Sequence, residues 1–321
     1  YKAESETMLA KKRLLTRSDF DGLVCAALLK ELDIIDEIRF VHPKDMQDGR
    51  ISITDSDITA NLPYVEGVFI AFDHHISEIS RVISPPNHIV YPNSPSAARV
   101  VYEYYGAEER FKNIPASLMQ AVDIADSAKY TMEQIKNPTG WTLLGFIMDA
   151  RTGLGRFKNF RINNYDLMMK LVDLCRTQDV EEILKDPDVK ERVDLYFKYQ
   201  DKFKEQIKKC TTVHKNLAYV DMLNEDVIYP GNRFMVYALF PEINISMQAM
   251  WRVNGQRIVF ALGKSILNKT NIINIGELML QYGGGGHATA GTCQIDLNDA
   301  AKVKDELIAI LTDPTYTEHA S

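Results

Sequence analysis

The apolar positions in the first part of the chain form short runs that predict β-strands, separated by a pattern of helical spacing. The runs cover residues 13–16, 38–42, 51–54 and 68–72, and a helix is expected from Gly22 through residue 31. Residues 68–72, Val-Phe-Ile-Ala-Phe, are apolar throughout, which is typical of a strand buried on both faces. Strands that alternate with helices predict a parallel sheet.

Acidic and histidine side chains follow three of these predicted strands. Asp19 and Asp21 come after the first strand, Asp55 follows the third, and the run Asp-His-His at 73–75 follows the fourth. Ligands of open α/β sheets lie outside the carboxyl ends of the strands, so we expect these side chains to meet at one edge. Helix N-capping explains a single acid after a strand. Three such positions, one of them with two histidines, indicate a shared site instead.

The remainder of the chain divides into a helical stretch and a second set of strands. Helices are predicted at 94–105 and 116–128, residues 141–150 form either a short apolar helix or a buried segment, and a charged helical pattern covers 165–209. Strands are predicted at 217–220, 234–239 and 258–262, with one helix between the last two and another at 275–281. We therefore expect an α/β protein in which a parallel-sheet domain (1–160) is joined by a helical linker (161–210) to a smaller α/β domain (211–321), with the active-site cleft between the domains.

The net charge of the chain bears on which nucleic acids it can bind. Its 44 acidic residues exceed its 37 basic residues, for a net charge of −7. Binding of long duplex DNA or RNA needs a basic surface, so the charge argues against such a partner. No apolar run is long enough for a membrane span, and the N-terminal dozen residues lack the apolar segment of a secretory signal. The four cysteines show no CxxC spacing. We expect a cytoplasmic protein.

The clustered acids and histidines favour a particular metal chemistry. Asp carboxylates with imidazole suit Mn²⁺ or Mg²⁺, whereas structural zinc more often recruits cysteine. A two-metal site needs a bridging carboxylate, and Asp55, alone at its predicted strand end, is placed to bridge, while Asp19 and Asp21 can each reach one ion. The chemistry predicted is attack of an activated water on a phosphoester.

Four consecutive glycines, Gly283, Gly284, Gly285 and Gly286, precede His287 near the end of the chain. Such a run is conformationally costly, and it is typical of backbone that must approach an anionic ligand closely. A plain turn needs fewer glycines and no histidine. We therefore expect this segment to hold part of the substrate from the second domain.

Taken together, four motifs resemble the signatures of the DHH phosphoesterase family, and more narrowly its two-domain nanoRNase and exopolyphosphatase-like members. They are Thr-Arg-Ser-Asp-Phe-Asp-Gly at 16–22, Ile-Thr-Asp at 53–55, Asp-His-His at 73–75 and Gly-Gly-Gly-Gly-His at 283–287. The likeness spans residues 13 to about 312 and implies a catalytic domain followed by a DHH-associated substrate-binding domain.

The resemblance implies a role for individual residues. It implies that the metal ligands are Asp19, Asp21, Asp55 and His74. Asp55 would bridge two ions, Asp73 would support the ligands, and His75 and His287 would contact substrate phosphate. Lys264 stands where relatives carry Arg, so it keeps the charge but loses bidentate geometry.

Two points depart from the family pattern or stay open. Relatives have His where this chain has Arg17, and guanidinium is a poor metal ligand. One ion is then weakly bound, or the Arg17 charge replaces it and acts on substrate phosphate. For the remaining acidic ligand there are two candidates, Asp126 and Asp149, and sequence context favours Asp126.

The leading hypothesis is a Mn²⁺- or Mg²⁺-dependent phosphodiesterase acting on short oligonucleotides or linear dinucleotides, in a chain that can form a homodimer. One alternative is an exopolyphosphatase or pyrophosphatase, and another is a nucleotide-binding protein of weak activity, because of Arg17. Bases need aromatic stacking partners near the glycine motif, and Tyr282 and Trp251 are candidates, whereas a polyphosphate chain favours more lysine and arginine there.

Overall fold

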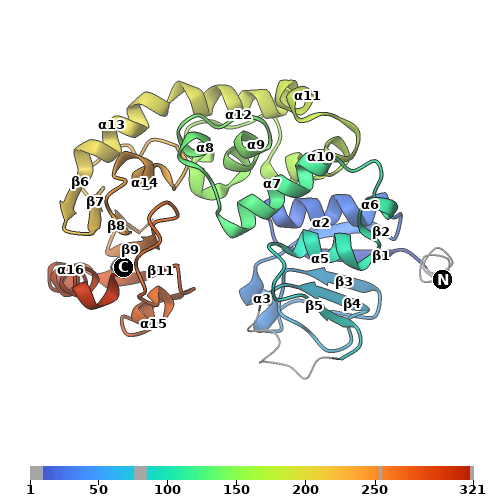
Figure 1. Cartoon of the computed structure of the whole chain (residues 1–321), viewed down its shortest axis with the longest axis horizontal. Helices are drawn as coiled ribbons and strands as arrows, with labels where there is room; N and C mark the ends of the chain where they lie inside the picture. Colours follow the sequence, from blue (N-terminus) through green and yellow to red (C-terminus); the bar gives the residue numbers. More distant parts are fainter. Residues whose placement is uncertain (1–9, 76–84, 253–254, 319–321) are drawn as a thin grey trace. The chain divides into compact units, whose positions relative to one another are not determined.

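Residue contacts divide the chain into two units (Figure 1). The computed structural model describes residues 10–75, 85–252 and 255–318. The first unit comprises Tyr1–Lys129, Thr139–Ala150 and Phe157–Val193, and the second comprises Tyr130–Pro138, Arg151–Arg156 and Asp194–Ser321. Residues 157–193, which include part of the predicted linker, thus pack with the first unit.

The first unit contains the predicted parallel sheet. Its strand order is β2-β1-β3-β4-β5, and all four neighbouring pairs are parallel. The strands are β1 (Lys12–Thr16), β2 (Ile35–Phe40), β3 (Asp57–Ala60), β4 (Ile70–Asp73) and β5 (His88–Val90). All residues of β3 and β4 are buried, as expected for central strands of a parallel sheet.

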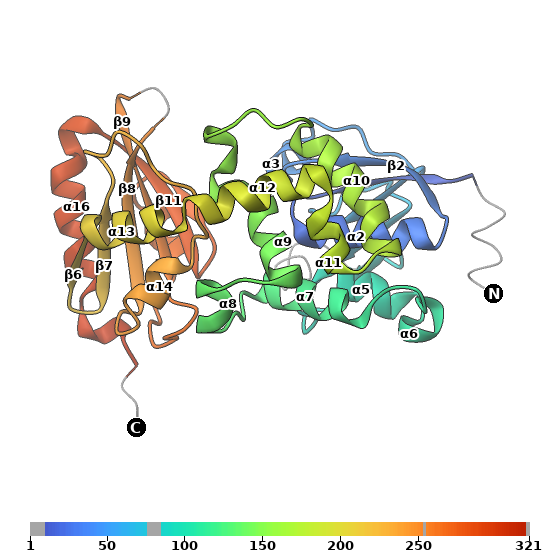
Figure 2. The same ribbon diagram turned by 90° about the horizontal axis from the view of Figure 1, so that it is seen from above.

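The helices of this unit pack on the sheet and on one another. They are α2 (Phe20–Glu31), α3 (Pro43–Gln47), α5 (Ala97–Tyr104), α6 (Ala107–Arg110), α7 (Ala116–Ser127), α9 (Gly140–Met148), α10 (Asn164–Thr177) and α11 (Val180–Lys185). Helix α2 is buried along almost its whole length because it contacts β1 and β2 and also α5, α7 and α10 (Figure 2). No helix in the described part of the chain is long and apolar enough to cross a bilayer.

The prediction of a strand at 51–54 is wrong. Strand β3 begins only at Asp57, and the preceding segment forms no ladder. Ile51 and Ile53 are half-buried against a small apolar cluster that contains Leu15 and Leu62. Their alternation with polar residues therefore records one-sided packing of extended backbone, and alternation alone cannot separate such packing from strand pairing.

Asp57 fixes the start of β3. Its carboxylate is buried and accepts hydrogen bonds from Arg13 Nε at 2.8 Å, Arg13 Nη2 at 3.2 Å and Thr54 N at 2.9 Å. We expect Asp57→Ala to lower the free energy of unfolding by about 3 kcal/mol, because a largely buried ion pair loses one partner. Urea denaturation followed by circular dichroism measures the change, and a loss below about 0.5 kcal/mol would contradict it.

The second unit is built on a mixed sheet of order β10-β11-β9-β8-β7-β6. Only β7 and β8 pair in parallel; the other neighbours are antiparallel. The strands are β6 (Thr211–His214), β7 (Leu217–Asp221), β8 (Ile245–Trp251), β9 (Arg257–Lys264), β10 (Gly285–Gly286) and β11 (Ala290–Asp296). The α/β class predicted for both domains is confirmed.

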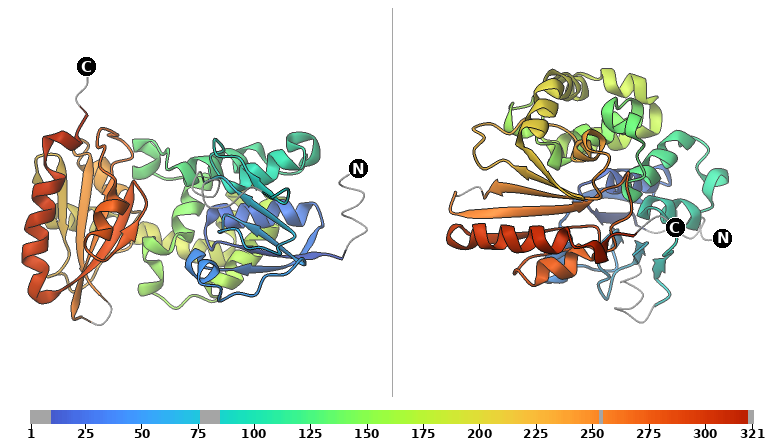
Figure 3. Two further views of the ribbon diagram at one scale, coloured as in Figure 1. Left: turned by 90° about the horizontal axis from the view of Figure 1, so that it is seen from below. Right: turned by 60° about the vertical axis from the view of Figure 1, so that its left-hand side comes forward.

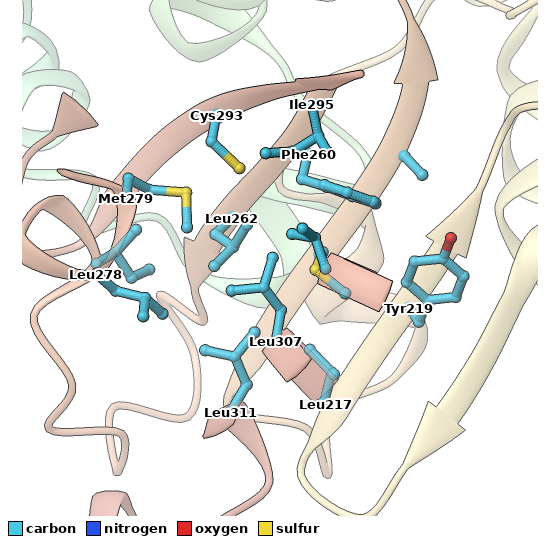
Figure 4. Close-up of a cluster of buried hydrophobic side chains, with 14 of the residues drawn as sticks. Leu217, Tyr219, Phe260, Leu262, Leu278, Met279, Cys293, Ile295, Leu307 and Leu311 are labelled. Atoms are coloured by element: carbon cyan, nitrogen blue, oxygen red, sulfur yellow. The ribbon is translucent and has the colours of Figure 1, made fainter. Parts of the chain in front are cut away.

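Helices lie on both faces of this second sheet (Figure 3). The helices of the second unit are α8 (Met132–Lys136), α13 (Gln200–Cys210), α14 (Met235–Leu239), α15 (Ile275–Leu280) and α16 (Leu297–Leu311). Helix α12 (Pro187–Lys198) spans the boundary between the units, and short 3-10 turns lie at Ala150–Thr152, Leu154–Arg156 and Pro314–Tyr316. Alternate residues of the strands pack with α15 and α16 into one core, whose members include Phe260, Leu262, Met279, Leu307 and Leu311 (Figure 4).

Two predictions for this unit are wrong. The apolar pattern of residues 234–239 predicts a strand, but most of these residues form helix α14, and the helix expected before residue 258 is strand β8. Four residues of α14 are buried, and a buried helix is apolar on all of its faces. A short apolar run of this kind does not distinguish a buried helix from a buried strand.

Candidate functional site

The residue run Asp-His-His lies at the carboxyl end of β4. Asp73 is the last residue of that strand, and its carboxylate is buried. Asp73 Oδ1 accepts hydrogen bonds from His74 N at 2.7 Å, His75 N at 3.1 Å and His75 Nδ1 at 2.5 Å. Asp73 therefore holds the backbone of the turn and orients the ring of His75, whose side chain is 40% exposed.

The ring of His74 is held from both sides. Its Nδ1 lies 3.0 Å from the carbonyl oxygen of Ser94, and its Nε2 lies 3.0 Å from Asp126 Oδ2. Burial by itself would lower the pKa of His74, but the nearby carboxylates, chiefly Asp126, outweigh it and raise the pKa to about 9. The Ser94 contact leaves Nε2 as the atom that faces Asp126, an arrangement typical of metal-binding histidines.

Asp21 is a buried carboxylate on the first turn of α2. Its oxygens accept hydrogen bonds from Ala97 N at 3.0 Å and Ala98 N at 2.8 Å, both at the start of α5, and from Asn61 Nδ2 at 3.2 Å. Burial, followed by the charges of Asp126 and Asp19, raises the pKa of Asp21 well above its ordinary value. A cation beside Asp21 would offset this unfavourable concentration of negative charge.

Asp21, His74 and Asp126 offer a set of metal ligands. Their ligand atoms all lie within 4.8 Å of one another, although they come from α2, the end of β4 and α7. Two carboxylates and an imidazole fit Mn²⁺ or Mg²⁺ in kind. The structure thus brings Asp126 to His74, and Asp149, the residue after α9, does not belong to a metal-capable group among the described residues.

Asp19 and Arg17 form a pair on the loop between β1 and α2. Asp19 Oδ1 caps α2 by accepting from Gly22 N at 2.8 Å, and Asp19 Oδ2 lies 3.6 Å from Arg17 Nε. Gly22 is required here because a Cβ at that position would lie 1.9 Å from the carbonyl oxygen of Arg17. The loop is thus tightly closed, with one cation and one anion on it.

The expectation that Asp55 reaches this site is wrong. Asp55 is exposed and precedes β3, so it lies at the amino end of a strand whose carboxyl end faces the cluster. The position at the carboxyl end belongs to Asn61, which follows Ala60 and adopts the left-handed conformation with φ 59°. Sequence reasoning missed Asn61 because the strand was placed too early.

A hydrogen-bond network around Asp123 holds α5 in place. Asp123 accepts from Ser96 Oγ at 2.9 Å and from Arg99 Nη2 at 2.7 Å, and Ser96 also caps α5. This network fixes the helix start whose N–H groups bind Asp21. Asp123 and Asp126 are three residues apart on one face of α7, yet the two carboxylates serve different partners.

Backbone packing and conformation require glycine at three of the four positions of the glycine run. A Cβ on Gly284 would lie 2.0 Å from the carbonyl oxygen of Thr292, and a Cβ on Gly286 would lie 2.3 Å from that of Ala290. Gly283 has a φ of +77°. Gly285 differs from the other three, because its φ is not positive and no atom lies within 4 Å of the place that a Cβ would take. Gly285 alone is therefore free of these constraints.

Two further predicted binding residues lie near the glycine run. His287 is exposed, and its N–H donates to the carbonyl of Ala290 at 2.7 Å. Lys264 ends β9, its N–H donates to the carbonyl of Thr289 at 2.9 Å, and burial lowers the pKa of its ammonium group. Both residues therefore lie at the same end of the second sheet.

The two aromatic candidates differ in position. Trp251 pairs with Ile258 in the β8–β9 ladder, whereas Gly291, next to the glycine run, pairs with Leu262. Ile258 and Leu262 are four residues apart on β9, a distance of roughly 13 Å. The prediction that Trp251 lies near the glycine motif is therefore wrong. Tyr282 is adjacent to the motif, but it packs on the core and donates to Glu306 Oε2 at 3.0 Å.

Two solved structures show what the chain is similar to. The pGpG-specific phosphodiesterase PggH from Vibrio cholerae shares 55% sequence identity, with a TM-score of 0.85 over 94% of this chain and 99% of that one. CDC45 from Entamoeba histolytica, at 10% identity and a TM-score of 0.55 over 94% and 96% of the two chains, shares the fold alone. No protein-family model and no curated protein matches the sequence. Its motifs, fold and 55% identical relative show that the chain is a phosphoesterase and belongs to the DHH phosphoesterase family.

Proposed function

We propose that this chain is a metal-dependent phosphodiesterase that hydrolyses linear dinucleotides such as pGpG. The observation that carries the proposal is the 55% identity, over nearly the full length of both chains, to a phosphodiesterase specific for pGpG. The cluster of Asp21, His74 and Asp126 supports it, because these donors suit Mn²⁺ or Mg²⁺. The acidic net charge fits a short substrate better than a long duplex.

The residues of the first unit have separate tasks in this proposal. Asp21, His74 and Asp126 would hold the divalent ion, which would supply Lewis-acid polarisation of the phosphoryl group. Ser94 and Asp73 are positioning residues, since they orient the rings of His74 and His75. His75 and Arg17 then contact the phosphate, His75 through the Nε2 that Asp73 leaves available and Arg17 through its planar fork.

The residues of the second unit bind the remainder of the substrate in this proposal. Gly285 supports such a role, because its conformation and surroundings do not by themselves demand glycine. His287 is exposed, and Lys264 carries a positive charge at the same end of the sheet. The charge of Lys264 and the exposed imidazole of His287 lie beside accessible backbone, which suits a phosphate or a sugar-phosphate backbone.

Assays on the purified full chain test this function. With Mn²⁺ present we expect hydrolysis of pGpG to GMP, far slower release of phosphate from pyrophosphate or polyphosphate, and loss of activity when EDTA removes the metal. Faster release of phosphate from polyphosphate would favour the phosphoanhydride alternative. Binding of pGpG without turnover, with Mn²⁺ present, would favour a nucleotide-binding protein.

A further inference from the structure

We propose that the catalytic cluster holds a single divalent ion, with Asn61 as a neutral oxygen ligand and with Arg17 providing the positive charge of a second ion. The inference rests on the proposed metal-dependent function and adds to it the number of ions and the ligand set. It departs from the two-ion site that the sequence motifs led us to expect, and it follows from the contacts of Asn61, Asp19 and Arg17.

Asn61 carries a buried oxygen beside the cluster. The residue is 3% exposed and lies at the carboxyl end of β3. Its Nδ2 donates to Asp21 Oδ2 at 3.2 Å, which places the side chain against a member of the metal-capable group. Its Oδ1 is buried and accepts no hydrogen bond from any residue that the structure describes. A buried oxygen without a partner is costly, and a cation in the cluster would satisfy it.

An amide at this position also limits the number of ions. A bridging carboxylate presents two oxygens that share a negative charge, one to each cation. The amide side chain of Asn61 has one oxygen. Its nitrogen is a donor that already faces Asp21, so it cannot serve as a second ligand atom. Asn61 can therefore ligate one ion but lacks the second oxygen and the charge that would hold two ions a few ångströms apart.

On the loop after β1, the positive charge of Arg17 takes the place of a second metal ion. Arg17 has only donors and cannot ligate a metal, and its Nε lies 3.6 Å from Asp19 Oδ2. The other oxygen of Asp19 is used to cap α2. A guanidinium that neutralises Asp19 disfavours a second cation by repulsion. It offers instead a fixed positive charge with bidentate geometry for a phosphate.

Metal binding to the full chain provides a readout that does not depend on hydrolysis. Titration with Mn²⁺, followed by calorimetry, is expected to give one ion per chain. The electron paramagnetic resonance spectrum of the saturated protein should be the hyperfine sextet of isolated Mn²⁺. Two ions per chain with an exchange-coupled spectrum, or no bound ion at all, would overturn the proposal.

Substitutions at Asn61 and Arg17 test the cause of the single occupancy. Asn61→Ala removes the neutral ligand and is expected to weaken Mn²⁺ binding by at least about tenfold. The double variant Asn61→Asp with Arg17→His supplies a second oxygen, a charge and an imidazole, and is expected to bind two ions with a coupled spectrum. Wild-type affinity of Asn61→Ala, or a double variant that still binds one ion, would contradict the ligand assignment.

A control variant separates the local effect from a general change in charge. Asn163 caps α10 by accepting from Asp166 N, and aspartate caps equally well, so Asn163→Asp adds one negative charge to the same unit without disturbing the helix. It is expected to bind one ion with wild-type affinity. Hydrolysis of pGpG by a protein that binds two ions would overturn this inference alone, whereas one bound ion without hydrolysis of pGpG would overturn the proposed function alone.

Discussion

Replacing Asp126 by Asn is expected to lower kcat for the dinucleotide by about 10³-fold or more. Asp126 lies 3.0 Å from His74 and belongs to the metal-capable group with Asp21. Removing this carboxylate weakens binding of the ion. The ion lowers the activation free energy by several kcal/mol through its Lewis acidity, and each 1.4 kcal/mol corresponds to about tenfold in rate. Steady-state kinetics at saturating Mn²⁺, together with Mn²⁺ titration, measure the loss of rate and the loss of affinity separately.

Asp149→Asn is the matched comparison, because the sequence left Asp126 and Asp149 as alternatives for the same role. Asp149 follows α9 and, among the described residues, is not in a metal-capable group. We expect its variant to keep Mn²⁺ affinity within about threefold and to remain active. If Asp149→Asn lost the ion and Asp126→Asn did not, the ligand assignment made from the structure would have to be reversed.

The Gly284→Ala variant is expected to lose about 3 kcal/mol in free energy of unfolding. Its methyl carbon would lie 2.0 Å from the carbonyl oxygen of Thr292 and 2.8 Å from Cys293 Cα. Both contacts are with backbone, so relief requires β10 to move away from β11, a form of overpacking that costs roughly 1–3 kcal/mol or more. Urea denaturation, followed by circular dichroism, reports the loss.

Gly285→Ala separates a structural role of the glycine run from a binding role. Nothing lies within 4 Å of a Cβ at Gly285, so we expect the stability of this variant to stay within about 1 kcal/mol of wild type. If Gly285 approaches the substrate, the added methyl group should raise KM for the dinucleotide by about tenfold. Unchanged stability with unchanged KM would show that the run serves only the packing of β10, α15 and β11.

Local sequence was sufficient to predict much of the first unit. The apolar run before Asp73 makes a buried strand, and its parallel neighbours place the residues after β1 and β4 at one edge. Gly22 and the Asp19 cap likewise follow from short-range geometry, since both act within a few residues of the loop. These features depend on covalent neighbours and on the general topology of parallel sheets, which residue patterns report directly.

The same patterns failed where two segments have similar local character. Residues 51–54 and 57–60 are both short and β-branched, and the choice between them depends on which one forms hydrogen bonds with β1 and β4. Burial of Ile51 and Ile53 against Leu15 and Leu62 gave the first segment the alternation of a strand. Residues 234–239 failed for a related reason, because a fully buried helix has no polar face.

The sequence by itself determined the family, the two α/β parts, the Asp-His-His turn and the glycine run, because each depends on contiguous residues and their intrinsic chemistry. Only the tertiary structure decided that Asp126 rather than Asp149 meets His74 and that Asn61 rather than Asp55 lies beside Asp21. These pairs join residues that are 40 to 52 positions apart, 61 − 21 and 126 − 74. Their contact depends on strand register and helix packing, which no local pattern encodes.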